Sequence, residues 1–483
     1  MSVREELKKI VGNENIVEDT DSLLRYCADE SPFKGKMPNY AVKVKSADEI
    51  KNILKLANKK KIPVVPSSSK IHFNGASLPT QGGILLDMSE MDKILLIDER
   101  NRKIIIEPGV SWKKIDEELE KKKLRMFNPL FPHSGTSALT DLLERVPALI
   151  PKFEYADPIL TLEAVFPTGD LMRTGSASIT MSYKGDNPAV DLVCPYGPGM
   201  DFFRLFHGAQ GTLGVVTWAA VKLEHRSPLK KLFLFGYEGI EDAISDIQKI
   251  QRSMIGQECF ILDNTNASLI LSQGDISKCE ALKRKLPKFL AMLMLRGAKR
   301  RPEEKIAYEE KALKEIMKDK DNEISSSFEQ ESEWLKGNVE KCWPDEKVYW
   351  KNMLKGRVLQ ISYKTTANRI PHLLSKYEQI VSTTNMKNIE CGLYIQPIEY
   401  GRAYHCEHHL YYEDNGKDIS DKILSFNRQA VMGLNSEGAF FSTPYGDVGK
   451  IIFDKTGGYR EAVRKIKNIF DPAGIMNPGR LSF

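Results

Sequence analysis

The sequence predicts an α+β protein of two domains, in which a domain of mixed helices and strands is joined to a cap domain built on an antiparallel sheet. Three observations support this prediction. The chain has 483 residues, more than one hydrophobic core usually supports. Residues 62–108 hold short apolar runs broken by Gly and Pro, and residues 230–430 alternate strand-like and helical runs. We therefore assign residues 1–226 to the first domain, 227–435 to the cap, and 436–483 to a C-terminal return to the first domain.

The first domain is expected to begin with helices and to continue with strands. Ser46 is a suitable helix cap, and Glu49, three residues later, completes a capping box. A turn at Thr168-Gly169-Asp170 predicts a hairpin. The expected helices are 4–11, 20–26, 47–60, 112–122, 137–146 and 201–206, and the expected strands are 40–44, 63–66, 83–87, 94–98, 103–108, 160–167, 171–174 and 215–223.

The cap is expected to alternate strands with helices, and the C-terminal return to consist of turns. Residues 175–200 are Gly- and Pro-containing and aperiodic, so we expect an irregular excursion there. The expected cap strands are 231–237, 257–262, 357–363, 392–398 and 405–412, and the expected cap helices are 241–253, 303–319, 370–382 and 417–432.

Composition excludes several classes of protein. Hydrophobic residues make up 41% and charged residues 28% of the chain, as in a globular enzyme rather than a disordered or coiled-coil protein. The 70 basic and 65 acidic residues nearly balance, and no broad basic surface with aromatic residues indicates nucleic-acid binding. Because the N-terminus is charged and no apolar stretch is long enough to span a bilayer, we expect a cytoplasmic protein without a membrane span.

The seven cysteines are scattered and never spaced as Cys-x-x-Cys. This argues against a disulfide framework, a structural zinc site or an iron–sulfur cluster within the chain. If electrons leave through iron and sulfur, a partner subunit must carry the cluster. We expect a homodimer or a part of a larger complex.

The segment from Pro66 to Gly75, Pro-Ser-Ser-Ser-Lys-Ile-His-Phe-Asn-Gly, directly follows an expected strand. Small residues and hydroxyls there let backbone N–H groups surround a pyrophosphate. It is neither a Rossmann fingerprint nor a Walker loop.

Further motifs follow in a fixed order. They are Gly82 to Ser89, Pro108-Gly-Val110, Phe131 to Val146, Pro167 to Gly175, Pro195-Tyr-Gly-Pro-Gly199, Phe206 to Thr217 and Phe470 to Arg480. As a group they resemble the vanillyl-alcohol oxidase and para-cresol methylhydroxylase superfamily of FAD enzymes, which includes glycolate and D-lactate dehydrogenase-like members. The resemblance implies an FAD-binding fold of the vanillyl-alcohol oxidase type.

The resemblance also implies which residues contact FAD. Ser67 to Asn74 look like the pyrophosphate loop, Gly109 and Val110 like an adenine-side contact, and Phe131 to Val146 like the stretch along the flavin ring. The implied cofactor residues are Pro66, Ser67, Ser68, Ser69, Lys70, Ile71, His72, Asn74, Gly109, Val110, Pro132, Ser134, Gly135, Ser137, Ala138, Asp141, Gly211, Leu213, Gly214, Val215, Asn477 and Arg480. We expect noncovalent FAD, with a covalent link through His72 as the alternative.

The chain departs from the family at two points. Ser134-Gly135-Thr136 stands where most members have consecutive glycines, and His133 stands where some have an acidic residue. The tyrosines and arginine with which the phenol-oxidising branch clamps a phenolate are not found: Phe73 stands near one tyrosine position, and residues Phe440 to Tyr445 stand near the others. Tyr445 or Arg402 could supply a different clamp.

A histidine-rich strand in the cap supplies candidate catalytic residues. Alternation places Tyr404, Cys406, His408 and Leu410 on one face and His405, Glu407, His409 and Tyr411 on the other. His405, Glu407 and His409 could bind a divalent metal, or His405 and Glu407 could perform acid–base chemistry. A buried hydrogen-bonded cluster is the commoner arrangement, so we predict no metal.

These residues favour a flavin-dependent oxidation of an alcohol or 2-hydroxy acid. His133 and His405 are the candidate bases, with Glu407 beside His405. Arg402, Tyr394 and Gln396 are the candidate substrate anchors, and Arg402 could pair with a carboxylate. The alternatives are an enzyme acting on para-substituted phenols and a flavin-containing electron-transfer subunit of a larger complex.

Overall fold

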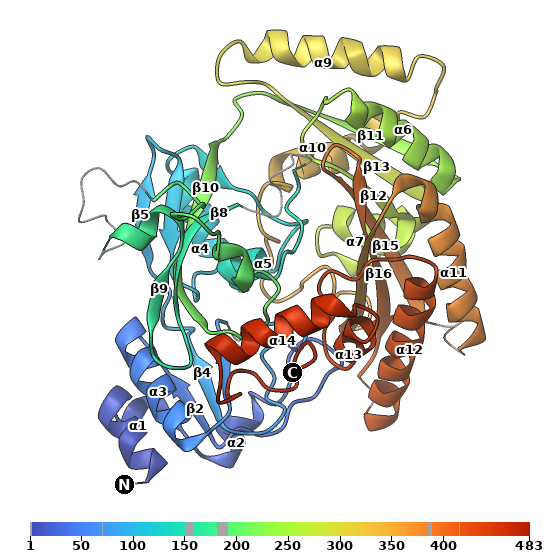
Figure 1. Cartoon of the computed structure of the whole chain (residues 1–483). Coiled ribbons are helices and arrows are strands. Elements are labelled where there is room, and N and C mark those ends of the chain that lie inside the picture. The colour runs from blue at the N-terminus through green and yellow to red at the C-terminus, as the bar shows by residue number, and fades with distance from the viewer. Residues whose placement is uncertain are drawn as a thin grey trace.

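Three β-sheets form the framework of the computed structural model, which describes residues 2–69, 71–150, 158–180, 192–384, 386, 389–414 and 416–483. In Figure 1 the N-terminal half, coloured blue to green, forms one side of the molecule, and the third sheet with its helices forms the other. The red C-terminal helices return between them.

The first sheet has four strands in the order β1-β2-β4-β3. Strands β2, β3 and β4 are parallel, and β1 is antiparallel to β2. Helix α3 packs against it and begins at the predicted cap, where Ser46 accepts a bond from the Glu49 N–H, while the Glu49 carboxylate accepts from the Lys45 N–H. The elements are α1 (Val3–Val11), β1 (Ile16–Val17), α2 (Thr20–Leu24), β2 (Tyr40–Lys43), α3 (Ala47–Lys60), β3 (Val64–Ser67) and β4 (Ile84–Asp87).

The second sheet has six antiparallel strands in the order β5-β6-β10-β8-β9, with β7 paired to β10. It contains the predicted hairpin, in which Glu163 lies opposite Arg173. Helix α5 is shorter than predicted, since Arg145 adopts a left-handed φ of 59° after it. The elements are β5 (Ile94–Asp98), β6 (Lys103–Ile106), α4 (Trp112–Glu120), β7 (Leu124–Met126), α5 (Ala138–Leu143), β8 (Ile159–Val165), β9 (Leu171–Arg173) and β10 (Val215–His225).

The third sheet is antiparallel, in the order β11-β13-β12-β15-β16-β14, and its strands lie within the segment interpreted as the cap. Helices α6, α9, α11 and α12 pack on one face around a large apolar core, and α7, α8 and α10 pack on the other. The elements are β11 (Lys230–Tyr237), α6 (Ile240–Arg252), β12 (Cys259–Asp263), α7 (Asn264–Leu271), α8 (Ile276–Lys285), β13 (Phe289–Arg296), α9 (Pro302–Ile316), α10 (Glu329–Asn338), β14 (Arg357–Thr365), α11 (Ile370–Thr383), β15 (Glu390–Ile398), β16 (Ala403–Tyr412) and α12 (Lys417–Ser436).

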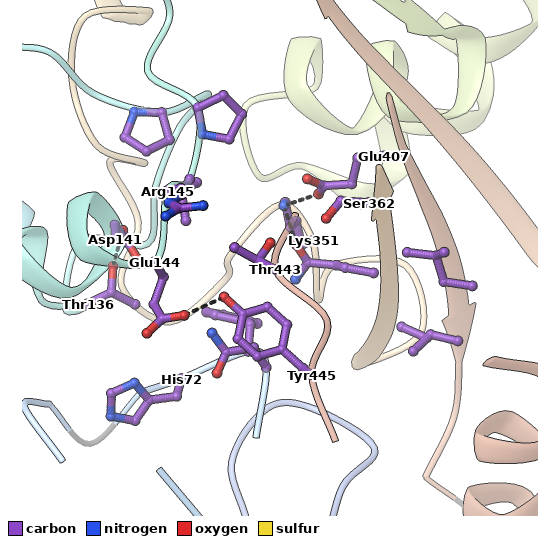
Figure 2. Close-up of a pocket in the computed structure, with 18 of the residues that line it drawn as sticks. His72, Thr136, Asp141, Glu144, Arg145, Lys351, Ser362, Glu407, Thr443 and Tyr445 are labelled. Atoms are coloured by element: carbon purple, nitrogen blue, oxygen red, sulfur yellow. Dashed lines mark hydrogen bonds and ion pairs between the residues drawn. The ribbon is translucent and has the colours of Figure 1, made fainter. Parts of the chain in front are cut away.

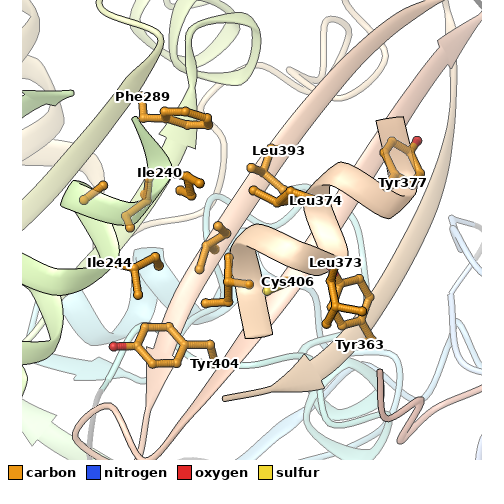
Figure 3. Close-up of a cluster of buried hydrophobic side chains, with 14 of the residues drawn as sticks. Ile240, Ile244, Phe289, Tyr363, Leu373, Leu374, Tyr377, Leu393, Tyr404 and Cys406 are labelled. Atoms are coloured by element: carbon orange, nitrogen blue, oxygen red, sulfur yellow. The ribbon is translucent and has the colours of Figure 1, made fainter. Parts of the chain in front are cut away.

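Strand β16 shows the predicted alternation. Tyr404 and Cys406 point into the apolar core with Tyr363 and Leu373, as Figure 3 shows. His405, Glu407 and His409 lie on the opposite face, where they bond to one another. The face of the third sheet that turns away from the apolar core is therefore polar near the middle of β16.

Several predicted elements were wrong or incomplete. Strand β13 was missed because all eight of its residues are buried, which gives a continuous apolar run instead of an alternating one. Helices α7, α8 and α10 were also missed. The segment 201–206 forms only a 3-10 turn at Phe203–Phe206, and part of the irregular segment 175–200 lies outside the described residues.

The C-terminal return contains two helices, α13 (Val448–Phe453) and α14 (Gly458–Phe470), where only turns were predicted. After α14 the chain pairs with β3: the Val64 N–H donates to the carbonyl of Ile475, and the Asn477 N–H donates to the carbonyl of Val64. The C-terminus thereby extends the first sheet. Among the described residues, no helix combines the length and apolarity that crossing a membrane requires.

Candidate active site

Two adjoining cavities lie where the three sheets meet. The first is bounded by the loops after β3 and β7, by the polar face of β14 and β16, and by residues Thr443 to Tyr445 of the C-terminal return. Figure 2 shows side chains from all of these segments pointing toward the same space. The second is bounded by the loop after β3, the end of α5 and the Gly-rich turn before β10. His72, Asn74, Thr140 and Glu144 line both cavities.

The second cavity is narrow because glycines let backbone segments approach closely. Gly211 has a φ of 68°, and a Cβ there would lie 2.5 Å from the ring of Pro66. A Cβ at Gly214 would lie 2.7 Å from the carbonyl oxygen of Val165. Side chains at these positions would displace the surrounding backbone, so these glycines are required where they stand.

Buried polar atoms surround the cavities. Within the described part of the chain, Ser134 Oγ, Gln210 Oε1 and Asn477 Oδ1 have no hydrogen-bond partner. Such atoms are costly to bury unless a ligand or water bonds to them. Of these three residues, Gln210 lines the second cavity. Its unpartnered amide oxygen, together with the glycine-lined walls, fits a polar cofactor.

The residues predicted to bind the cofactor divide into two groups. Those lining a cavity are Pro66, Ser68, Ile71, His72, Asn74, Pro132, Ser137, Asp141, Gly211, Gly214 and Val215. Those behind the walls are Ser67, Ser69, Gly109, Val110, Ser134, Gly135, Ala138, Leu213, Asn477 and Arg480. Lys70 lies outside the described residues.

Several residues of the second group hold the walls together. The amide of Asn477 donates to the carbonyl oxygens of Ala76 and Gln210, and Arg480 donates to the carbonyl of Leu78. A Cβ atom at Gly109 would lie 2.7–2.9 Å from three backbone carbonyl oxygens, so only glycine fits there. These residues position the loops and do not line either cavity.

Four of the six residues predicted to be catalytic meet in the first cavity. They are His133, His405, Glu407 and Tyr445. The predictions for Arg402 and Tyr394 are corrected: neither lines the cavity. Arg402 is exposed in the turn between β15 and β16, and Tyr394 is buried behind His405 with its hydroxyl bonded to Gln396. Gln396 in turn donates to the carbonyl of Ala148 and is likewise no substrate anchor.

Both predicted bases have an acceptor nitrogen already engaged. His133 Nδ1 accepts a 3.0 Å bond from the Gly135 N–H, and His405 Nδ1 lies 2.8 Å from Lys364 Nζ. Burial lowers the pKa of both rings, that of His405 to about 4. Both rings are therefore neutral near pH 7.

Sequence reasoning missed the cationic residues of the first cavity, Lys351, Lys364 and Arg145. Lys351 Nζ lies 2.7 Å from Glu407 Oε1 and 2.7 Å from Gln360 Oε1. Burial raises the pKa of Glu407, but Lys351 and the two neighbouring histidines outweigh it, so that the pKa lies well below its ordinary value. Alternation along β14 places Gln360, Ser362 and Lys364 on one face, a signal that could have identified the lysine.

Two acidic side chains, Asp141 and Glu144, line the cavity wall opposite β14 and β16. Asp141 accepts a 2.7 Å bond from the Trp112 indole, and Glu144 accepts a 2.8 Å bond from the Tyr445 hydroxyl. Burial raises the pKa of Asp141 to about 6 and that of Glu144 to about 7. At neutral pH this wall therefore carries less negative charge than its two carboxyl groups would give in water.

The His405, Glu407 and His409 side chains are bonded to one another. Glu407 Oε2 lies 3.1 Å from His405 Nε2, and Glu407 Oε1 lies 2.5 Å from His409 Nε2. No group of three or more potential metal ligands was found among the described residues.

Comparison with known proteins agrees with this geometry. Residues 38–138 match the family described as "FAD binding domain", and residues 455–481 match "FAD linked oxidases, C-terminal domain". Glycolate oxidase subunit GlcD of Bacillus subtilis is 32% identical over 51% of this chain and 50% of its own length. D-2-hydroxyglutarate dehydrogenase of Stutzerimonas stutzeri is 21% identical over 99% and 98%. This chain thus aligns with only half the length of the first of these relatives.

A solved structure has the same fold. The crystal structure of p-cresol methylhydroxylase with substrate bound matches with a TM-score of 0.85 and 16% identity, over 99% of this chain and 96% of that one. The two matched families identify the chain as an FAD-linked oxidoreductase, and FAD is its cofactor, as the sequence predicted. Its fold is that of p-cresol methylhydroxylase.

Proposed function

We propose that this protein uses bound FAD to oxidise an alcohol that carries an anionic group, with 2-hydroxy acids as the substrate class. Lys351, Lys364 and Arg145 all line the first cavity, which adjoins the glycine-lined second cavity. This concentration of cations beside the cofactor cavity is the observation that carries the proposal. We also propose that residues 227–435 act as a substrate-binding cap domain and that the protein is cytoplasmic.

The charges of the cavity support an anionic substrate. Glu407 is paired with Lys351, whereas Lys364 contacts the neutral imidazole of His405. Because the pKa values of Asp141 and Glu144 are raised to about 6 and about 7, at neutral pH their carboxyls offset less of the charge on Lys364 and Arg145 than two fully ionised groups would. A carboxylate bonded to a lysine or arginine gains a charge-assisted hydrogen bond.

In this proposal the second cavity holds FAD and the first cavity holds the substrate. FAD, when bound, supplies a hydride acceptor. In this proposal Ser68, Gly211 and Gly214 lie beside the cofactor, and the remaining cofactor residues named from the sequence hold their loops. The cap residues on β14 and β16 orient the substrate and handle its hydroxyl proton.

Anaerobic reduction of the FAD-loaded protein tests this proposal. The panel contains glycolate, D- and L-lactate and D-2-hydroxyglutarate. Its matched control is 1,2-propanediol, in which a hydroxymethyl group replaces the carboxylate of lactate. We expect one 2-hydroxy acid to bleach the long-wavelength flavin band and the diol to bleach it far more slowly. Equal bleaching by both would contradict an anion-binding role for the cavity.

A second candidate class is para-substituted phenols. Phe73, His133 and Tyr349 form an aromatic cluster beside the cavity, with ring centroids 5.0–6.2 Å apart. Neither residue proposed from the sequence as a clamp is available, because Tyr445 bonds to Glu144 and Arg402 lies outside the cavity. Lys364 would have to bind the phenolate. Bleaching by para-alkylphenols but by no hydroxy acid would favour this class.

Electron transfer to a partner subunit is the third candidate. The Bacillus relative is itself called a subunit, and we propose that an iron–sulfur or other electron-transfer partner, or a second copy of this chain, assembles with this one. Reoxidation of the reduced protein by oxygen, compared with reoxidation by a soluble one-electron acceptor, tests this candidate. Slow reaction with oxygen and fast reaction with the acceptor would support a partner.

A further inference from the structure

A chain of hydrogen bonds runs behind the cap wall of the first cavity. The Tyr411 hydroxyl donates to Asn266 Oδ1 over 2.6 Å, and Asn266 Nδ2 lies 2.9 Å from His409 Nδ1. An amide nitrogen donates and does not accept. His409 Nδ1 is therefore an acceptor, and the proton of this neutral ring lies on Nε2.

The chain of hydrogen bonds continues through Glu407. His409 Nε2 donates to Glu407 Oε1, and the second carboxylate oxygen, Oε2, accepts from His405 Nε2. Since the proton of His405 lies on Nε2, its Nδ1 accepts, and the donor is Lys364 Nζ at 2.8 Å. All of these bonds agree with one arrangement of protons.

This arrangement places Lys364, and not His405, at the cavity end of the chain. The free nitrogen lone pair of His405 is covered by Lys364, so this ring cannot take a proton from a substrate while that contact lasts. Lys364 itself lines the cavity. A neutral amine can donate one N–H to His405 and still direct its own lone pair toward a substrate.

We propose that Lys364 is the catalytic base for the substrate hydroxyl and that His405 is a positioning residue. The inference rests on the proposed function. In the reaction, the substrate O–H bond breaks and its proton moves to Lys364 Nζ. The carbon–hydrogen bond breaks with its electron pair, which leaves as hydride for bound FAD, and a carbonyl forms. The substrate loses two electrons, and FAD gains them.

The surroundings of Lys364 lower its pKa, so that a fraction of the lysine is neutral near physiological pH. Burial, opposed by Glu407 and Cys406 and assisted by the charge of Arg145, lowers the pKa of Lys364 to about 8. The titratable and charged groups that face Lys364 are His405, Cys406 and Glu407 on β16, Arg145 after α5, and Lys351 before β14. Lysines with lowered pKa values serve as general bases in enzymes.

The variant Lys364→Arg distinguishes two possible roles of Lys364, that of a catalytic base and that of a binding residue for the substrate anion. Arginine keeps the positive charge but does not deprotonate in this pH range. We expect the variant to bind FAD and to bind the substrate within a few-fold of the native protein, while the rate of flavin reduction falls roughly 100-fold or more. The native rate should rise with pH, with its midpoint near pH 8, and the variant should lose this rise. A near-native rate for Lys364→Arg would overturn the proposal.

Amine modification gives a readout that does not depend on turnover. The FAD-loaded protein is reductively methylated at a series of pH values, and modification of Lys364 is followed by peptide mass spectrometry. We expect half-maximal modification near pH 8, compared with about 10.4 for an ordinary lysine. Modification only at the ordinary pH would overturn the proposal even if substrate oxidation occurs.

A matched pair of variants tests the positioning role of His405. His405→Leu should shift the pH profile of Lys364 modification, because it removes the acceptor. His408→Leu, on the opposite face of β16 where the ring stacks on Tyr377, should leave the profile unchanged, and FAD absorption reports folding of both variants. Equal profiles for both variants would overturn the positioning role. If Lys364 reacts near pH 8 but no hydroxy acid reduces the flavin, the proposed substrate class fails, and the base role falls with it.

Discussion

The phenol hydroxyl of Tyr445 donates a 2.8 Å hydrogen bond to Oε2 of Glu144 and thereby joins the C-terminal return to the residue that follows helix α5. Glu144 lines both cavities and lies where they meet. Burial raises its pKa to about 7 even though Tyr445 stabilises the charged form. This carboxyl therefore titrates near neutral pH at the junction of the two cavities.

Glu144 should make the free energy of unfolding depend on pH. Its pKa is higher in the folded protein, about 7, than in an unfolded chain, about 4.3. Folding thus favours the protonated form, and stability should fall as pH rises from about 4.3 to 7. In Glu144→Gln this part of the dependence is absent, so the variant should gain roughly 1–3 kcal/mol relative to native protein across this range. Urea unfolding at a series of pH values measures it.

The control for this experiment is Asp141→Asn, because Asp141 titrates in an overlapping range with a pKa of about 6. The difference between native protein and each variant isolates one carboxyl. Parallel pH profiles for native protein and Glu144→Gln would show that Glu144 does not titrate as described.

Glu258 should be one of the most sensitive charged residues of the fold. It is 1% exposed and accepts bonds from Arg125 Nη1 at 2.8 Å and Arg296 Nε at 2.6 Å. Burial raises its pKa, but the two arginines outweigh burial and lower it to about 2. Glu258→Gln leaves two buried guanidinium groups without this charge, so we expect a loss of about 3–5 kcal/mol in chemical denaturation.

An exposed pair provides the comparison for Glu258. Glu304 lies 3.2 Å from Arg301, and both side chains are 68% exposed. Glu304→Gln should change stability by less than about 0.5 kcal/mol, because solvent screens such pairs. Similar losses for both variants would mean that the buried ion network contributes no more than a surface pair.

The sequence predicted both strands of the cap wall of the first cavity, but it identified the cavity-lining residues of only one of them. Period-two alternation correctly separated the two faces of β16, because each face packs against a different environment. Lys364 was missed because its role depends on β14 pairing with β16, where Lys364 lies opposite His405. This pairing joins residues 41 positions apart, and no local pattern specifies it. Arg402 was misplaced for the opposite reason: it is close to His405 in sequence, but the turn carries its side chain away from the cavity.

Local sequence patterns predicted more of the elements in residues 1–226 than in residues 227–435. The strand ends and glycines that bound the second cavity have short-range signals, such as the Ser-rich loop at Ser67 to Ser69. Strand β13 and the buried acid Glu144 have no such signal. The first is a continuous apolar run, and the second acquires its raised pKa from burial in the folded protein, which no local pattern specifies.

FAD should be released from the native protein by acid precipitation. His72 lines both cavities, but its Nε2 lies 3.3 Å from Ser67 Oγ, and burial lowers the pKa of the ring. We therefore expect a yellow supernatant and a colourless pellet, and we expect His72→Ala to retain FAD absorption. A yellow pellet from native protein and a colourless one from His72→Ala would instead establish a covalent link at this residue.

Gly211→Ala should weaken FAD binding through the geometry of the second cavity. The substitution introduces a Cβ 2.5 Å from the ring of Pro66 at a φ of 68°, so the Gly-rich turn and the loop after β3 must separate. We expect the dissociation constant for FAD to rise at least about 10-fold, equivalent to 1.4 kcal/mol, measured by quenching of flavin fluorescence in apoprotein. Gly457→Ala is the matched control, because its φ of 50° is also left-handed, but no heavy atom of the described residues lies within 4 Å of its Cβ position. Both variants carry the backbone strain, and only Gly211→Ala carries the contact. A larger loss of affinity for Gly211→Ala therefore assigns the effect to the cavity, whereas equal losses would assign it to a general loss of stability.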